Sequence, residues 1–438
     1  MDTHIYDNLP PEDNAMLQAL YSRSPKGVLE QLERLKSVDA GKFMEQYYVG
    51  YGHESIADCG STTIFIEGVS MYAAKMIQQN PLYRGQEAST RYQDFLKLHK
   101  QPFHSFMHTE LSTGQDRVEY EKICECLLDL YEQVFPLLQK GIEAAYEIDA
   151  QNKTHTRAVF AYACDIAGAL LPIATKTNLS WHTDLRQAFD HIKRLVTHPY
   201  LHVRELGNQI LTQLRQRYPH TFSGEVPTEE RDIEWYTGPD DLFWVQSSHP
   251  PHVWEDEGVR KILVPYLYYR KRLEMLPDWT DQFGTLTLQG MMDFRSWRDI
   301  ARHRGSRISF PDIAENRGVF AADYVDRLNR YLPTEVFDKL CNRLYPLIRR
   351  AQSLGDPELY VMALPMGVNV PLSYSATLRQ ALYVAELRSA RNVHFTVRTF
   401  AQSIGRYLDR LNIPNYTCHD PSEFSVSRGN QTITEKKE

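Results

Sequence analysis

The sequence lacks several features that would place it in a common class of protein. Its 438 residues include six cysteines, none of which form a C-x-x-C pair, so neither a zinc ribbon nor a disulfide framework is predicted. It also lacks a basic surplus, because the net charge is −7 and the pI is near 6.2. This balance argues against a generic nucleic-acid-binding protein, although single arginines can still bind small anions.

Long hydrophobic runs are also absent. No stretch of eighteen apolar residues occurs, and the opening MDTHIYDNLPPEDN is acidic and contains prolines but no apolar core. We therefore expect a soluble protein of the reducing cytoplasm, without a membrane segment. The chain has no G-x-G-x-x-G after a strand-like run and no well-formed Ser/His/Asp or Cys/His signature. A Rossmann dinucleotide domain is thus not expected.

The chain contains a long internal repeat. LPIATKTNLSWHTDLRQAF, from Leu171, aligns without gaps with LPMGVNVPLSYSATLRQAL, from Leu364. A second pair of phrases follows, HVRELGNQI from His202 and FTVRTFAQSI from Phe395. The spacing is too long for a solenoid and predicts two similar domains in tandem. We place domains at 1–222 and 252–421, a Gly-, Pro-, Asp- and Ser-rich linker at 223–251, and a disordered tail at 422–438.

Local patterns predict a mixed α and β fold. Around the opening motif, Ser55 with Asp58 reads as a capping box, residues 62–66 as a strand and residues 71–78 as a helix. Gly68 should end the strand. Elsewhere, residues 1–25 read as a loose arm, Val28 to Leu35 as a helix, and 118–146 as a long amphipathic helix. No metal site is predicted: a helical face carrying His191, His198 and His202 would be interrupted at Pro199.

Two short clusters carry most of the candidate chemistry. In Gln86 to Arg91, an extended backbone would project Glu87, Ser89 and Arg91 to one side, where they could hold a sugar and a phosphate. The alternative is a solvated loop with a surface ion pair. In Arg302-His303-Arg304, two guanidinium groups flank an imidazole and could face a flavin ring or a phosphate. The alternative here is a helix end capped by cations.

These clusters resemble the two parts of the signature of the flavin-dependent thymidylate synthase family, R-H-R followed by E-x-S-x-R. The first half of the chain keeps E-x-S-x-R at residues 87–91, but its R-H-R positions hold Gln79-Asn80-Pro81. The second half keeps R-H-R at residues 302–304, but its loop positions hold Phe310, Asp312 and Ala314. Each half retains what the other has lost. GHES at residues 52–55 and IEGVS at 66–70 are also similar to that family.

The resemblance implies two tandem thymidylate-synthase-complementing-like domains, each with a mixed sheet and a helical layer. It implies an FAD-dependent methyltransferase for dTMP biosynthesis, which methylates C5 of dUMP with methylenetetrahydrofolate and NADPH as co-substrates. Arg302, His303 and Arg304 would contact the flavin and stabilise the negative charge of its reduced ring. The implied nucleotide-binding residues are Gln86, Glu87, Ser89, Arg91 and Arg388. The implied contacts to FAD phosphate or adenosine are His53, Ser55, Arg186 and Arg379.

The resemblance also implies an assembly and a composite site. Since family members are homotetramers, a chain with two such domains should form a homodimer. One R-H-R and one E-x-S-x-R per chain predict one FAD per chain, with nucleotide chemistry from the first domain and flavin chemistry from the second.

The chain departs from the family at several positions. The phosphate-binding arginine of the family falls on Gly168 and Val361, and its flavin-contacting histidine falls on Cys59. Two alternatives therefore stay open. One is a diverged nucleotide- or flavin-binding protein without catalysis, and the other is flavin-dependent C5 modification of a different pyrimidine nucleotide.

Overall fold

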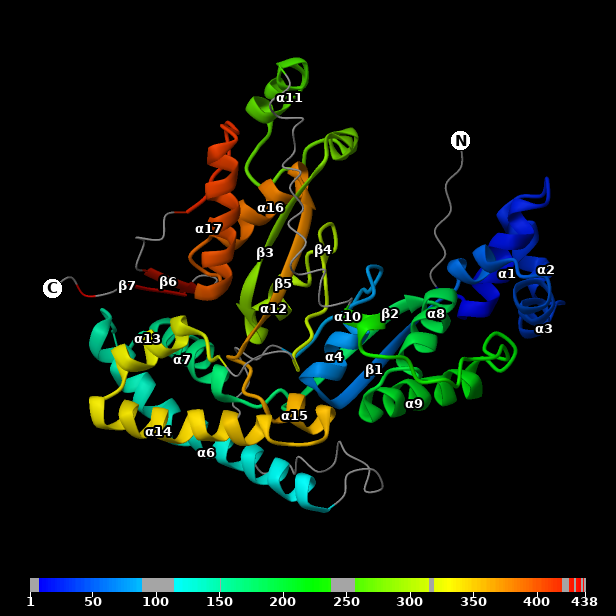
Figure 1. Cartoon of the computed structure of the whole chain (residues 1–438). Helices are drawn as coiled ribbons and strands as arrows, with labels where there is room; N and C mark the ends of the chain where they lie inside the picture. The colour runs from blue at the N-terminus through cyan, green and yellow to red at the C-terminus, as the bar shows by residue number, and fades with distance from the viewer. Residues whose placement is uncertain are drawn as a thin grey trace. The chain divides into compact units, whose positions relative to one another are not determined.

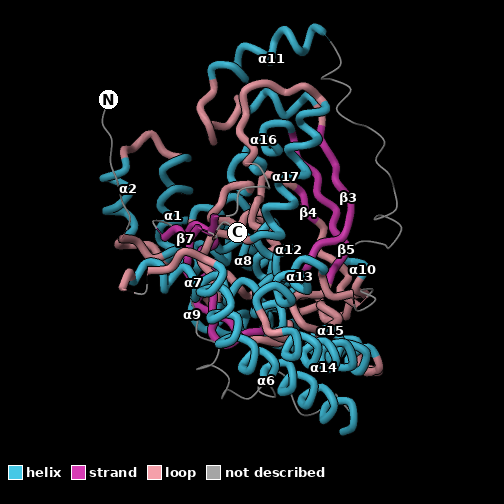
Figure 2. Tube along the Cα trace, turned by 90° about the vertical axis from the view of Figure 1, so that its left-hand side faces the viewer, coloured by secondary structure: helices cyan, strands magenta, loops and turns pink. Residues whose placement is uncertain are grey.

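The computed structural model describes residues 8–88, 114–149, 151–237, 257–314, 319–419, 425–428, 431–434 and 436. Helices dominate, and small antiparallel sheets accompany them, so the predicted mixed α and β class is confirmed (Figures 1 and 2). The described residues within 1–88 and 176–233 form one compact unit, and those within 109–175 and 234–438 form another. The boundaries drawn from the repeat stay a prediction, since the compact units divide the chain differently.

The first unit is built around one strand pair and the helices beside it. Its elements are α1 (Pro11–Ser22), α2 (Val28–Leu35), α3 (Ala40–Met44), the π-helical turn η1 (Glu45–Gly50), the 3₁₀ turn η2 (Glu54–Cys59), β1 (Ser61–Ser70), α4 (Met71–Gln78), β2 (Lys176–Asp184), α8 (Leu185–Leu195) and α9 (Leu201–Arg217). The predicted order of helical turn, strand and helix across the opening motif is confirmed, and so is the helix from Val28 to Leu35.

Three local predictions in this unit are wrong. Residues 11–22 are helical rather than a loose arm, because Ala15, Met16, Leu17 and Ala19 are buried. The turn after Gly52 is capped at His53 without a side-chain hydrogen bond, so Ser55 is not its cap. Gly68 does not end the strand: at φ +69° it sits in an irregularity of β1, and pairing with β2 resumes at Val69.

The second unit contains the longer helices and a three-stranded sheet in the order β3-β5-β4. Its elements are α6 (Gly114–Ala145), α7 (Lys153–Ala167), the 3₁₀ turn η4 (Gly168–Leu170), α10 (Glu234–Thr237), α11 (Glu257–Tyr269), the 3₁₀ turn η7 (Asp278–Phe283), β3 (Thr285–Asp293), α12 (Phe294–Ile300), β4 (Arg307–Ile308), α13 (Ala322–Tyr331), α14 (Thr334–Gln352), α15 (Pro357–Ala363), β5 (Asn369–Thr377), α16 (Leu378–Arg388), α17 (Phe395–Arg410), β6 (Ser425–Arg428) and β7 (Gln431–Thr434). The long helix predicted from 118 to 146 is confirmed as α6, which lies beside α14 (Figure 1).

The internal repeat is also a repeat of structure. In both units a nine-residue strand leads directly into an eleven-residue helix, β2 into α8 and β5 into α16. The helix is capped by the last strand residue each time, Asp184 in one unit and Thr377 in the other, which accepts a hydrogen bond from the amide three residues later. Each of these strands pairs antiparallel with the strand that precedes a shorter helix, β1 or β3.

Strand register fixes which residues are equivalent. Ser70 pairs with Lys176 at the end of β1, and Asp293 pairs with Asn369 at the end of β3, so Ser70 and Asp293 occupy the same place. In each unit the chain that follows the shorter helix, α4 or α12, pairs with the repeated strand, β2 or β5, along the edge opposite to β1 or β3. Arg84 and Glu87 bridge to β2, and β4 pairs with β5 through Arg307. Glu87 is therefore equivalent to Phe310, as the sequence alignment of the signature indicated.

The C-terminal residues that the structure describes are ordered as a hairpin. β6 and β7 pair antiparallel, Ile433 is buried, and the amide of Glu147 donates to the carbonyl of Thr434. The predicted disorder of 422–438 is therefore wrong for these residues, because the hairpin has a partner at the end of α6. Within the described ranges, no helix is long and apolar enough to cross a membrane, and no group of three His, Cys, Asp or Glu side chains could hold a metal ion.

Candidate functional site

The R-H-R cluster lies just beyond the C-terminus of α12. Asp293 caps the start of this helix, and after Ile300 the chain turns tightly: the amide of His303 donates to the carbonyl of Ile300 and that of Ser306 to the carbonyl of His303. The turn buries His303, which is 7% exposed, and leaves Arg302 and Arg304 exposed. Two guanidinium groups therefore flank a buried imidazole on the surface of the second unit.

His303 is held by Arg388, the last residue of α16. Arg388 Nε donates a 2.6 Å hydrogen bond to His303 Nε2, and Nη2 lies 3.5 Å from the carbonyl oxygen of Asp299. Burial and the charge of Arg388 lower the pKa of His303 to about 3, so the ring is neutral near pH 7. Because Nε2 accepts this hydrogen bond, the ring carries its proton on Nδ1. The structure thus joins a predicted flavin residue to a predicted nucleotide residue.

This arrangement is suited to an anionic or electron-rich ligand. Arg302, Arg304 and Arg388 each carry a permanent charge, and the neutral imidazole adds a hydrogen-bond donor rather than a fourth charge. The alternative of a helix end capped by cations describes only part of this arrangement, because Arg388 comes from a different helix and contacts the imidazole.

Glu87, from the other part of the signature, is buried. Its Oε2 lies 2.6 Å from Lys75 Nζ on α4, and both side chains are 1% exposed. Gln78 Nε2 also donates to Glu87 Oε2 at 3.1 Å. The alternative of a surface ion pair is therefore wrong for Glu87, since the pair is enclosed. Ser89 and Arg91 lie outside the described residues, so the predicted alignment of the three side chains stays a prediction.

Gln86, the neighbour of Glu87, is exposed. Its amide donates to Ser180 Oγ at 3.1 Å, and its carbonyl accepts from the amide of Ser180. The segment is therefore fixed against β2 by its backbone, while the Gln86 side chain faces away from the core.

Arg186 and Arg379 occupy the same place in the two units, each as the second residue of the repeated helix. Arg186 Nε donates to Asp58 Oδ1 at 2.5 Å and Nη1 to Glu54 Oε2 at 3.3 Å. Arg379 binds Asp278 and makes two hydrogen bonds to Asp281, of 3.1 and 2.5 Å. Each arginine thus ties its helix to the acidic 3₁₀ turn before the first strand. Their predicted role in binding FAD stays a prediction.

The other predicted cofactor residues stand at the same turn of the first unit. His53 is exposed, and its ring lies near those of Tyr47 and Tyr51 at centroid distances of 6.5 and 6.1 Å. Ser55 is also exposed, and its carbonyl oxygen accepts from Cys59 Sγ. Burial is the main cause that raises the pKa of the Cys59 thiol, so it is not activated as a thiolate.

Sequence reasoning missed Arg295. This residue is the reason that position 168 holds glycine, where the resembled family has its phosphate-binding arginine. A Cβ at Gly168 would lie 2.2 Å from Arg295 Nη1, so the guanidinium occupies the space that a side chain there would need. Arg295 is 5% exposed, and its Nη2 donates to the carbonyl of Cys164 at 3.0 Å. Arg295 is far from Gly168 in the sequence, but its guanidinium lies beside it. Gly168 is one of the two positions where the resembled family has an arginine. Only the closeness in space reveals this.

Sequence reasoning also missed Asp293. This carboxyl group is 2% exposed, and its Oδ1 accepts from the Tyr324 hydroxyl and from the Ser296 amide, both at 2.8 Å. Burial raises its pKa to about 6 despite these hydrogen bonds. In sequence it reads as an ordinary helix cap.

Comparison with known proteins shows a family to which the first half of the chain is similar. Residues 6–220 match the model of the family described as thymidylate synthase complementing protein. The match covers most of the first half of the chain. A UPF0159 protein of Chlamydia pneumoniae is 22% identical and covers 99% of this chain and 94% of its own length. The UPF0159 protein Ta1429 of Thermoplasma acidophilum is 21% identical and covers 89% and 91%. Both relatives therefore extend beyond the family match into the second half.

Among solved structures, flavin dependent thymidylate synthase ThyX from Helicobacter pylori, complexed with FAD and dUMP, is similar at 14% identity and a TM-score of 0.29. The match covers 50% of this chain and 96% of that one. The match of residues 6–220 to the family model confirms the resemblance that the signature residues of the first half carried. Activity, cofactor and substrate are a separate question.

Proposed function

We propose that the chain is an FAD-dependent enzyme that methylates C5 of dUMP to give dTMP, with methylenetetrahydrofolate as the carbon donor and NADPH as the reductant. The observation that carries this proposal is the hydrogen bond from Arg388 to His303 between two exposed arginines. This contact brings the R-H-R motif, residues 302–304, together with Arg388, the arginine that matches a second motif of the resembled family.

The residues of the second unit fit a flavin in their chemistry. FAD, when bound, supplies the hydride chemistry, so the protein needs to orient ligands and offset charge rather than provide a nucleophile. Arg302 and Arg304 are exposed and would offset the negative charge of a reduced ring. Neutral His303, with its proton on Nδ1, would donate a hydrogen bond without competing for protons at neutral pH.

The nucleotide role falls to the signature residues between 86 and 91. Gln86, Ser89 and Arg91 would bind the base, ribose and phosphate, and Arg388 would add a cation. Glu87 would act indirectly, because its carboxylate is committed to Lys75. In this proposal its ion pair fixes the start of the loop against α4.

The test is turnover of dUMP to dTMP by purified protein supplied with FAD, NADPH and methylenetetrahydrofolate, read by chromatography. Arg304→Ala should lower flavin affinity, and Arg91→Ala should raise the dUMP concentration for half-saturation, each by roughly ten- to a hundredfold for one charge-assisted contact. Arg410→Ala, an exposed arginine at the end of α17, is the matched control and should leave both unchanged. Loss of neither affinity in the two variants would contradict the proposal.

A second function is supported by other observations. The repeat holds Gly168 and Val361 where the family has arginine, and Arg186 and Arg379 are already bound by carboxylates. A nucleotide- or flavin-binding protein without catalysis would need fewer cationic contacts. It would bind FAD or dUMP and form no dTMP. Formation of a different C5-modified product from dCMP would instead indicate another pyrimidine substrate.

The proposed assembly is a homodimer of two-domain chains. Light scattering of the purified protein should give twice the chain mass. A monomer that binds flavin, or a tetramer of full chains, would contradict this.

A further inference from the structure

The imidazole of the R-H-R cluster has a second neighbour from α16. The ring of Tyr383 lies beside the ring of His303, with centroids 6.4 Å apart and ring planes inclined by 67°. Tyr383 precedes Arg388 on the same helix, so one helix presents both an aromatic ring and a guanidinium to this imidazole. None of the roles assigned above uses the tyrosine.

Tyr383 is accessible to a ligand of the cluster. It is half-buried, whereas His303 is buried and Arg302 and Arg304 are exposed. A flat ligand held by the exposed arginines and touching the imidazole therefore comes within reach of the phenol ring. The three fused rings of a flavin are longer than the 6.4 Å that separates the two centroids. A flavin at the cluster can thus contact both rings.

The aromatic ring occurs in the half of the chain that keeps R-H-R. In the aligned repeat, Tyr383 corresponds to Asp190 of α8, and Arg388 corresponds to Leu195. Asp190 is exposed and pairs with Lys193 at 3.2 Å. The repeated helix therefore forms with a small acidic side chain at this position, so its fold does not require a tyrosine. A carboxylate there would also repel an anionic ligand.

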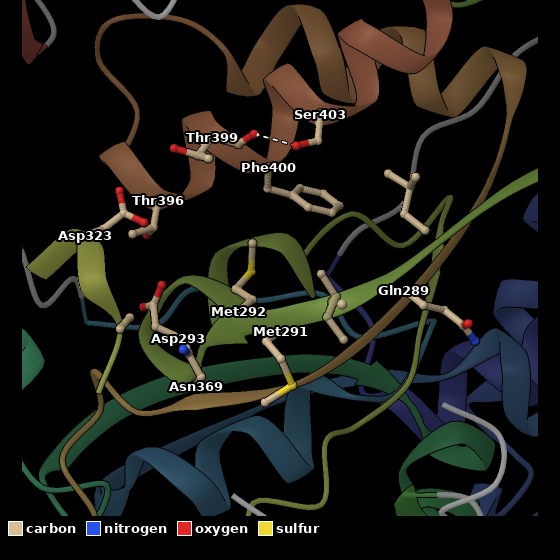
Figure 3. A pocket seen from close by; sticks show the side chains of 14 residues that line it. Gln289, Met291, Met292, Asp293, Asp323, Asn369, Thr396, Thr399, Phe400 and Ser403 are labelled. Carbon is tan, nitrogen blue, oxygen red and sulfur yellow. Dashed lines mark hydrogen bonds between the residues drawn. The ribbon is translucent and has the colours of Figure 1, made fainter. Parts of the chain in front are cut away.

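The cavity between β3 and α17 is a poorer place for a flavin nucleotide (Figure 3). Its volume is about 300 Å³, at the lower end for ligand pockets. Asp293 and Asp323 line it, and none of the described lining residues is Lys, Arg or His. The phosphates of FAD would meet two carboxyl groups and no cation in this lining. The R-H-R cluster offers the opposite charge.

We propose that Tyr383 packs against the isoalloxazine ring of FAD when FAD is bound at the R-H-R cluster. This inference rests on the proposed flavin-dependent function and adds an aromatic contact to the charges of the cluster. Guanidinium groups attract many anions, whereas an aromatic ring favours a flat partner through offset or edge-to-face contact. Tyr383 therefore helps the cluster to select a flavin over a simple anion.

The experiment is titration of the flavin-free full chain with FAD, and of the same protein with dUMP by calorimetry. Tyr383→Leu should weaken FAD binding roughly three- to tenfold, as expected for the loss of one aromatic contact, and leave dUMP binding unchanged. Tyr383→Phe should bind FAD like wild type, because it keeps the ring. Tyr345→Leu, at a half-buried tyrosine of α14, is the matched control and should change neither affinity.

The fluorescence of the bound flavin gives a readout that a purely structural role of Tyr383 would not move. A phenol in contact with a flavin quenches its fluorescence, because the phenol donates an electron to the excited ring and then takes it back. Phenylalanine is a much poorer electron donor. Tyr383→Phe should therefore bind FAD with wild-type affinity and leave the bound flavin brighter.

Four outcomes would overturn the inference. They are no binding of FAD by wild type, wild-type FAD affinity in Tyr383→Leu, unchanged fluorescence of the flavin bound to Tyr383→Phe, and weaker binding of dUMP in place of FAD, which would assign the ring to the base. Only the first also contradicts the proposed function, so the two failures are distinguishable. A thermal melt checks folding, and Tyr383→Phe, which loses one hydroxyl group, decides the question if Tyr383→Leu does not fold.

Discussion

Arg388 Nε donates a 2.6 Å hydrogen bond to Nε2 of His303, which joins residues eighty-five positions apart. Arg388 ends α16 in the repeated segment, and His303 follows α12. The contact fixes the tautomer of the imidazole and one N–H of the guanidinium at the same time. An arginine that sequence comparison assigns to a nucleotide phosphate therefore also positions the histidine of the R-H-R motif.

The first prediction concerns this pair. Arg388→Met should raise the pKa of His303, because it removes a nearby positive charge that disfavours the protonated ring. Proton NMR of the imidazole resonances across a pH series measures the shift. Arg388→Lys keeps a cation in place and should move the pKa less. An unchanged His303 pKa in Arg388→Met would show that burial alone sets it.

A second prediction concerns acid stability. The pKa of His303 is depressed from 6.5 to about 3 in the folded protein, so the neutral ring contributes stability that is present above pH 6.5 and is lost as the pH falls toward 3. The full loss is on the order of 5 kcal/mol. His303→Gln cannot titrate, and its stability should fall less between pH 7.5 and 5 in urea denaturation. His53→Gln, at an exposed imidazole, is the control. Parallel pH profiles for wild type and His303→Gln would refute this.

The third prediction concerns the Lys75–Glu87 pair, whose charged atoms are 2.6 Å apart and buried. Glu87→Gln should lower the free energy of unfolding by about 3–5 kcal/mol, because it leaves a buried ammonium without its counter-charge. The double change Lys75→Met with Glu87→Leu should recover much of the loss. Replacing the exposed pair Lys36 and Glu33 should have little effect. A mild effect of Glu87→Gln would mean that water reaches Lys75.

The fourth prediction concerns Asp293. Its folded pKa, about 6, is above the usual 3.8, so the protonated carboxyl is favoured at low pH and this advantage is lost as the pH rises through 6. Above that pH the buried charge costs about 3 kcal/mol. Asp293→Asn should therefore gain stability relative to wild type as the pH rises from 4 to 7.5. Asp323→Asn, at a less buried carboxylate, should show a smaller trend. A constant difference between Asp293→Asn and wild type would contradict the pKa.

The sequence predicted the repeat well. Both copies contain a nine-residue strand with alternating burial, followed by a helix that is capped at the same position, and this gives similar residue patterns in the two halves. It did not reveal that the Glu87 side chain is buried, since alternation along a loop shows which side chains share a side but not that Lys75 lies beside one of them. It missed Asp293 and Arg295, because their partners Tyr324 and Cys164 are remote in sequence. Local patterns predict elements, and only packing shows which polar groups become buried.

The central claim is that the R-H-R cluster around His303 binds flavin, and titration of flavin-free protein with FAD tests it most directly. The quenching of FAD fluorescence should saturate at about one FAD per chain, since each chain has one R-H-R and one E-x-S-x-R. Arg304→Ala should weaken this binding roughly ten- to a hundredfold, while Arg410→Ala should not. Two equivalents of equal affinity, or the same affinity in Arg304→Ala as in wild type, would contradict the account.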